Sequence, residues 1–149
     1  MPTALVSLLP VFLLGALLLP VTRSPVLAVA VEGDLLQVRL GIWDKIYCFR
    51  RNFAVPVGDV EGAAVAPRHL VPTRGMRLPG TGIPGVIRAG SFGSGPNRDF
   101  WDVRKAEMLL VIELRHGAEY RRIVLQVADP AAVSRELRPL LGAFTGAFL

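Results

Sequence analysis

The fold is decided by residues 108–141, which read MLLVIELRHGAEYRRIVLQVADPAAVSRELRPLL. Met108–Leu114 is apolar except for one glutamate, which predicts a strand buried on both faces of a sheet. A turn signal follows, and residues 120–127 are expected to form its partner strand. The period then changes, because Asp129 offers a helix N-cap and Pro130 suits the first helical position. We therefore expect a strand pair closed by a helix over about residues 130–141.

Upstream, short apolar stretches alternate with turns from residue 26 onward. Residues 26–31 and 35–40 flank Glu32-Gly33-Asp34 and predict a hairpin. Two more strands are expected over residues 50–57 and 60–66. Between the hairpin and these strands, Ile42–Cys48 is either one helical turn or an irregular crossing.

Residues 67–98 hold so many prolines and glycines that no helix is expected there. A short strand is predicted over residues 86–92, and another over residues 99–104. Gly80-Thr81-Gly82-Ile83-Pro84-Gly85 matches the pattern G-x-G-x-x-G, but a dinucleotide site also needs a helix opening from the last glycine. Too few residues follow before Gly90 for that helix, so we interpret the stretch as successive turns.

Several stretches resemble the bacterial pleckstrin-homology-like domain families. They are Arg77-Leu78-Pro79-Gly80-Thr81-Gly82-Ile83-Pro84-Gly85-Val86, Gly90-Ser91-Phe92, Arg98-Asp99-Phe100-Trp101 and Leu125-Gln126-Val127-Ala128-Asp129-Pro130. The resemblance spans about residues 26–141. It implies a mainly β fold with one C-terminal α-helix, built as a barrel or sandwich from a meander of about seven strands. It also implies a binding or assembly module. Lipid-binding eukaryotic members carry basic residues in the first hairpin loop, where this chain has Glu32-Gly33-Asp34.

The N-terminus is apolar enough to span a bilayer. Residues 2–22 carry no charge, and a helix over residues 4–21 would be about 27–30 Å long. We expect residues 1–23 to be a membrane-anchor helix and residues 24–149 to be the domain. Alternatives are a secretory signal peptide cleaved near Ala28-Val29-Ala30 and a buried helix. Positive charges follow the segment, which favours a cytoplasmic domain, and a soluble cytoplasmic or secreted protein is the alternative.

The net charge of +5 is concentrated in the middle of the chain, because no acid occurs between Glu61 and Asp99. The arginines of this stretch form a candidate anion or partner surface: Arg68, Arg74, Arg77, Arg88 and Arg98. The alternative is a set of solvated arginines on loops.

The residue types that catalysis needs do not converge in the sequence. Cys48 is the only cysteine, and His69 and His116 lie far apart, so neither a disulfide nor a metal site is expected. Asp99 and Asp102 would face opposite sides of a strand and so could not act as a pair. The neighbouring Phe100 and Trp101 are expected to fill the core rather than stack on nucleic-acid bases.

The sequence therefore predicts a non-catalytic, membrane-tethered module that binds an unknown protein partner and needs no cofactor. The alternatives are binding of an anionic lipid headgroup or another anion through the arginine-rich stretch 67–98, and a small enzyme. Nucleic acid is not expected as a partner.

Overall fold

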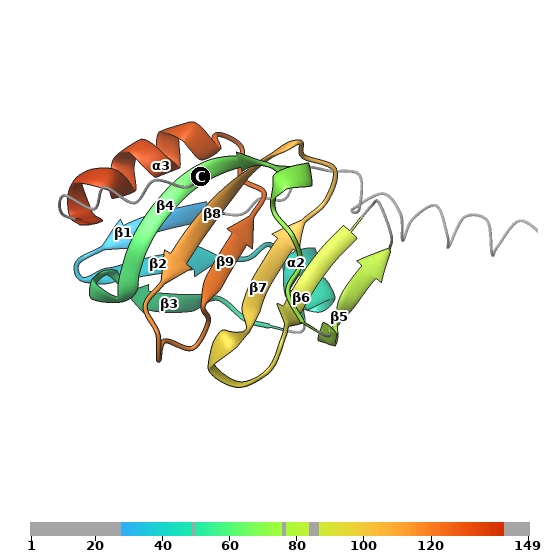
Figure 1. The fold of residues 1–149 in the computed structure, drawn as a ribbon. Coiled ribbons are helices and arrows are strands. Elements are labelled where there is room, and N and C mark those ends of the chain that lie inside the picture. Colours follow the sequence, from blue (N-terminus) through green and yellow to red (C-terminus); the bar gives the residue numbers. More distant parts are fainter. Residues whose placement is uncertain (1–27, 49, 76, 84–86, 142–149) are drawn as a thin grey trace, which may run out of the picture.

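The computed structural model describes residues 28–48, 50–75, 77–83 and 87–141 (Figure 1). Two sheets hold the nine strands of these residues. The smaller sheet has the order β1 (Ala28–Glu32), β2 (Leu35–Arg39) and β3 (Phe53–Pro56). The larger has the order β4 (Val60–Pro67), β8 (Met108–Leu114), β9 (Arg122–Leu125), β7 (Asp99–Val103), β6 (Ile87–Phe92) and β5 (Arg77–Ile83).

The helical elements are short. They are α2 (Ile42–Cys48), α3 (Pro130–Leu137) and the 3₁₀ turns η1 (Val57–Asp59), η2 (Arg68–Leu70), η3 (Gly95–Asn97) and η4 (Arg138–Leu141). None of the helices in the described part of the chain is long and apolar enough to cross a membrane. The anchor predicted over residues 1–23 lies outside the described residues.

The mainly β class and the C-terminal helix are confirmed. The first hairpin forms as expected, with Glu32 paired to Leu35 and Gly33 at a φ of 60°, a conformation that favours glycine. The strand pair expected over residues 108–114 and 120–127 is also present, because β8 pairs with β9 antiparallel. Of the two readings left open for Ile42–Cys48, the structure shows the helix.

Helix α3 begins where the sequence predicted. The carboxylate of Asp129 accepts a hydrogen bond from the backbone N–H of Ala132 at 2.9 Å, and Pro130 is the first helical residue. The α-helix ends at Leu137 and continues as the 3₁₀ turn η4, which contains Pro139. Proline cannot donate the backbone hydrogen bond that would extend an α-helix.

Removing this N-cap is expected to destabilise the domain by about 1 kcal/mol, because one helix N–H group loses its acceptor. The variant is Asp129→Ala, and the measurement is the free energy of unfolding in urea. Asp129→Asn is the matched control, since its side-chain oxygen can still accept the bond. Equal losses in both variants would contradict a capping role.

The expected meander order is wrong in the larger sheet. β9 lies between β8 and β7, and it pairs with β7 in parallel. Both strands are buried throughout, which suits central positions in a sheet. In this register Asp99 lies opposite Arg122, so opposite charges meet across the two strands. The chain therefore departs from a simple meander, and it has more strands than the seven expected.

The interpretation of residues 80–85 as successive turns is also wrong in part. Gly80 to Ile83 belong to β5, which pairs with β6 at the edge of the larger sheet. The register shifts between Arg77 and Gly80, around Pro79. Proline is tolerated in an edge strand or at a bulge, so it does not exclude a strand there.

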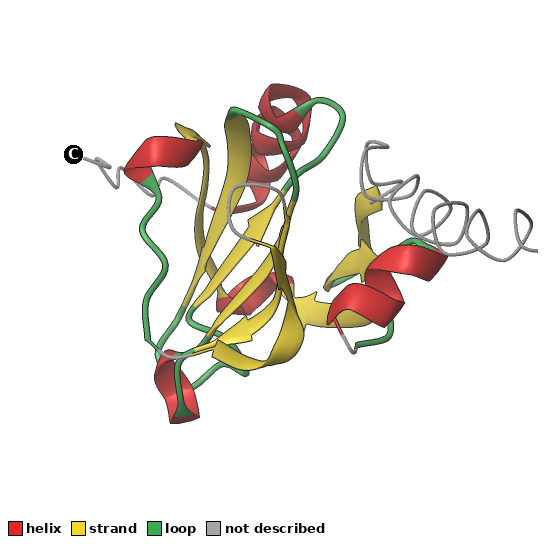
Figure 2. Cartoon of the chain, turned by 90° about the vertical axis from the view of Figure 1, so that its right-hand side faces the viewer, coloured by secondary structure: helices red, strands yellow, loops and turns green. Residues whose placement is uncertain are grey.

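The larger sheet has an apolar core on each face. One core lies between the larger sheet and the smaller sheet with α3, and it includes Leu36, Phe53, Phe100 and Leu137. The opposite face holds a second cluster: Val71, Phe92, Trp101, Val103, Leu109, Val111 and Val124. Figure 2 shows α2 on one side of the larger sheet and the turn η2 on the other. The second face is therefore covered in part by the loop that follows β4.

Candidate functional site

An open hollow of about 970 Å³ lies where the loop after β4 meets the turn between β7 and β8. Residues from both segments line it, together with Arg88 of β6. Its cationic side chains are Arg68, Arg88 and Lys105, and its one acidic side chain is Glu107. The predicted anion surface is thus partly brought together here, because two of its five arginines share this hollow.

The pairing of β4 with β8 brings these segments together. Pro67 lies opposite Met108, so the residues after β4 lie beside those before β8. The N–H of Arg68 donates to the carbonyl of Glu107 at 2.7 Å. The Arg68 guanidinium donates to the carbonyl of Arg104. Arg68 is therefore positioned by two backbone contacts across the hollow.

The loop at the base of the hollow is fixed to the sheet. Val71 is buried in the second core cluster, and the carbonyl of Pro72 accepts a hydrogen bond from Arg122 at 2.6 Å. Gly75 lies against Gly93 with a φ of 76°, and a Cβ at position 75 would stand 2.6 Å from the Gly93 Cα. Only glycine fits this close approach, so the loop is held in one place.

Arg68 and Arg88 lie close enough in the hollow for their positive charges to repel each other. Burial, and then the charge of Arg68, lower the pKa of Arg88. The Arg88 guanidinium lies 5.0 Å from the ring centre of Trp101. Within the described residues, neither Arg68 nor Arg88 is in an ion pair, whereas seven other arginines are: Arg39, Arg50, Arg98, Arg104, Arg115, Arg121 and Arg122.

The other predicted arginines lie elsewhere. Arg74 is exposed, and it lies near Glu113: burial raises the pKa of Glu113, an effect that the charges of Arg122 and Arg74 oppose. Arg77 lies in β5, but its side chain is outside the described part of the structure. Arg98 joins a separate network.

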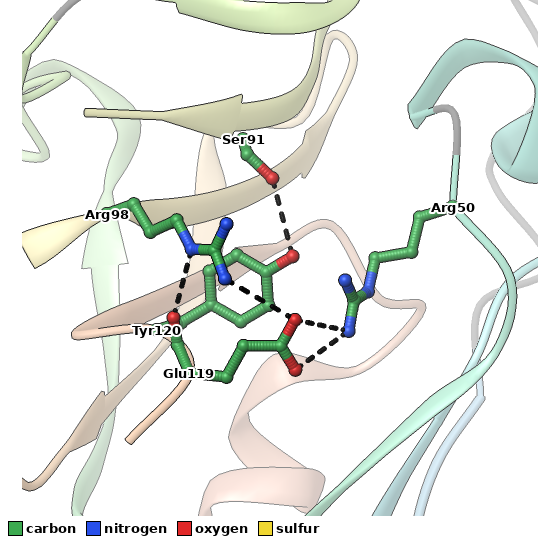
Figure 3. A network of polar contacts seen from close by, with 5 residues as sticks. All are labelled: Arg50, Ser91, Arg98, Glu119 and Tyr120. Carbon is green, nitrogen blue, oxygen red and sulfur yellow. Dashed lines mark hydrogen bonds and ion pairs between the residues drawn. The ribbon is translucent and has the colours of Figure 1, made fainter. Parts of the chain in front are cut away.

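Figure 3 shows that network, which gathers around Tyr120. Arg50 contacts both carboxylate oxygens of Glu119 at 2.8 Å, and Arg98 donates to the Glu119 carbonyl at 3.1 Å. Both guanidinium groups lie just over 5 Å from the centre of the Tyr120 ring, at 5.1 and 5.2 Å. The Tyr120 hydroxyl is 3.3 Å from the hydroxyl of Ser91. Because the positive charges of Arg50 and Arg98 converge on the carboxylate of Glu119, the network joins loops and strands rather than leaving cations free for a ligand.

The two aspartates of β7 are confirmed to face opposite sides of the sheet. Asp99 accepts two hydrogen bonds from Arg122, at 3.0 and 2.5 Å. Asp102 is almost fully buried on the other side, near Asp44 of α2, which pairs with Arg104. Burial, and then the charge of Asp44, raise the pKa of Asp102 to about 8. Neither aspartate lines the hollow.

Cys48, Phe100 and Trp101 belong to the core, as predicted. Cys48 is buried, and burial strongly raises the pKa of its thiol. Phe100 and Trp101 have no exposed surface. These side chains are therefore not available to stack on a ligand from solvent.

Several residues that line the hollow are not among those predicted from the sequence. Lys105 and Glu107 lie in the turn before β8, Met108 is the first residue of β8, and His69 lies in η2. The available signal was the pairing of the strands predicted over residues 60–66 and 108–114, since an antiparallel hydrogen-bonded pair would place residue 68 near residue 107. That pairing was not predicted.

These observations define a mainly β domain with one C-terminal helix and a basic hollow on the outer face of its larger sheet. Comparison of the chain with protein-family models, with curated proteins and with solved structures found no match.

Proposed function

We propose that this domain is a non-catalytic binding module and that an anionic group of its ligand occupies the basic hollow. One observation carries the proposal. Arg68 and Arg88 line the same hollow, burial and then the charge of Arg68 lower the pKa of Arg88, and neither has an ion-pair partner among the described residues. An anion placed between them would relieve this repulsion and accept charge-assisted hydrogen bonds.

The charge of the hollow supports an anionic ligand. Three cationic side chains and one carboxylate line it, which gives a net charge of +2 when His69 is neutral. A concave surface lined mainly by one sign of charge concentrates the field toward its opening. Arginine also presents donors that match the oxygens of phosphate or carboxylate groups.

The positions of the acids support a binding role rather than catalysis. Asp99 accepts hydrogen bonds from Arg122, and Asp102 lies on the opposite face of β7. General acid–base catalysis would require such groups within reach of one bound substrate. The carboxylate that does line the hollow is Glu107, and it is exposed.

We further propose that residues 1–23 tether the module to a membrane with the domain on the cytoplasmic side, and that its ligand belongs to a protein partner or to an anionic lipid. The apolar sequence and the charges after it support the tether. The pleckstrin-homology-like relationship is likewise a proposal. The mainly β class and the C-terminal helix agree with it, whereas the parallel β7–β9 pair departs from a meander.

The test is a calorimetric titration of the full chain with inorganic phosphate and with pyrophosphate at low ionic strength. Arg68→Gln and Arg88→Gln are each expected to weaken binding about tenfold to a hundredfold, since each removes charge-assisted hydrogen bonds worth about 1.5–3 kcal/mol. Added salt should weaken wild-type binding.

Arg135→Gln is the matched control. Arg135 is exposed on α3, where it donates to the Ala131 carbonyl of the same helix. This variant loses the same charge outside the hollow and should bind like the wild type. Equal weakening in all three variants would mean that net charge alone attracts the anion, and the hollow would not be its site.

A further inference from the structure

Two exposed apolar side chains stand beside the basic hollow. Leu70 ends η2 between two residues that line the hollow, and 65% of its surface is exposed. Met108 lines the hollow itself and is 45% exposed. Single exposed apolar residues are common on proteins. Here, however, both adjoin the place where Arg68 and Arg88 gather without ion-pair partners in the described part of the chain.

This combination suits an interface between water and lipid better than a free anion in solution. A soluble phosphate would interact with the cationic side chains but would leave Leu70 and Met108 in water. An anionic bilayer offers phosphate groups at its surface and apolar chains just below them, so both kinds of side chain gain favourable surroundings.

The sequence supplies a second argument for a bilayer. Residues 4–21 are apolar and uncharged, and the first strand of the domain begins at Ala28. If these residues anchor the chain, the domain stays close to the membrane surface. A weak contact with lipid headgroups would then be strengthened by the high effective concentration of the tethered domain.

We propose that the hollow docks on an anionic bilayer, where Arg68 and Arg88 bind lipid phosphate and Leu70 and Met108 enter the headgroup region. This inference rests on the proposed anion binding and adds the source of the anion. The neighbouring Lys105 is exposed and contributes to the same contact, whereas Glu107 opposes it.

The test uses the full chain carrying Leu70→Cys, labelled with a polarity-sensitive fluorophore and reconstituted into vesicles. Cys48 is buried and unreactive, so the label is directed to position 70, and labelled wild type gives the background. On vesicles of phosphatidylglycerol and phosphatidylcholine the emission is expected to shift to the blue. On vesicles of phosphatidylcholine alone it should not shift. Arg68→Gln with Arg88→Gln should abolish the shift.

The control label is placed at His116→Cys. His116 is exposed in the turn at the opposite end of β8 from Met108, so it should report water on both kinds of vesicle. A shift at position 116 equal to that at position 70, or a shift at 70 that ignores lipid charge or the two arginines, would overturn the inference.

The phosphate titration and the label at position 70 together distinguish this inference from the proposed function. If wild type binds inorganic phosphate and loses it with Arg68→Gln, but the label at position 70 stays silent on anionic vesicles, the lipid source is wrong and the anion-binding module stands. A soluble acidic partner would then be the occupant. If phosphate does not bind to the wild type and the label is silent, both proposals fail.

Discussion

Replacing Asp102 with asparagine is expected to remove a strong decline in stability between about pH 4 and pH 8. Asp102 is 1% exposed, and burial followed by the charge of Asp44 raises the pKa of its carboxyl from 3.8 to about 8. Between these values the unfolded chain has released the proton while the folded protein keeps it. The folding equilibrium constant therefore falls as the pH rises, by up to tenfold per pH unit, and the stabilisation is lost once the pH passes the folded pKa.

The measurement is urea unfolding of the full chain and of Asp102→Asn at intervals from pH 5 to pH 9. Other titrating groups affect both proteins, so the quantity to follow is the difference between their free energies of unfolding. That difference should change in favour of the asparagine variant as the pH rises and should level off above about pH 8. Two parallel curves would show that the buried carboxyl is not protonated at neutral pH.

Asp102 is buried in a small polar cluster with Asp44 of α2 and Arg104, and burial is the main cause of its raised pKa. Arg104 pairs with Asp44, and the positive charge of Arg104 opposes the rise in the pKa of Asp102 without cancelling it. One oxygen of Asp102 is buried without a hydrogen-bond partner among the described residues. Ionisation of Asp102 would place two carboxylates beside one guanidinium, a costly arrangement in a low-dielectric interior.

Local sequence patterns predicted most of the elements and the strand pairs that a short turn connects, but not the pairing of strands far apart in the sequence. The hairpin turn at Gly33 and the N-cap at Asp129 act within a few residues, so their signals are visible in sequence. The position of β9 between β8 and β7 depends on a contact between residues far apart, such as Asp99 with Arg122. No local pattern distinguishes that pairing from a meander.

The candidate site shows the same limit. Arg68 and Arg88 were recognised because the acid-free stretch between Glu61 and Asp99 is visible in composition. Lys105 lines the hollow only because β4 pairs with β8, and Arg98 lies outside it, in an ion pair with Glu119. Strand β5 was missed for a related reason, since its glycines and Pro79 disfavour a strand until β6 provides a partner.

Breaking the buried pair of Asp99 and Arg122 is expected to cost about 3–5 kcal/mol of unfolding free energy. The side chain of Asp99 is fully buried and that of Arg122 is 4% exposed. Oδ1 of Asp99 has no hydrogen-bond partner in the described structure, so the carboxylate depends on its contacts with Arg122 through Oδ2. Either Arg122→Met or Asp99→Leu leaves one buried charge without its ion-pair partner beside the apolar cluster around Trp101. The measurement is urea unfolding at neutral pH.

The double variant, Asp99→Leu with Arg122→Met, should recover most of that loss, because two apolar side chains of similar length replace the pair and no buried charge remains. Arg121→Met is the matched control: its ion-pair partner is Glu61, both side chains are partly exposed, and the expected cost is about 1 kcal/mol or less.

Arg122→Met also removes the group that donates a hydrogen bond to the carbonyl of Pro72. Phosphate binding in the hollow should therefore weaken in Arg122→Met and in the double variant alike. Recovery of stability without recovery of binding would separate the two roles of Arg122. A double variant as unstable as the single ones would instead mean that the pair contributes through packing that methionine and leucine cannot replace.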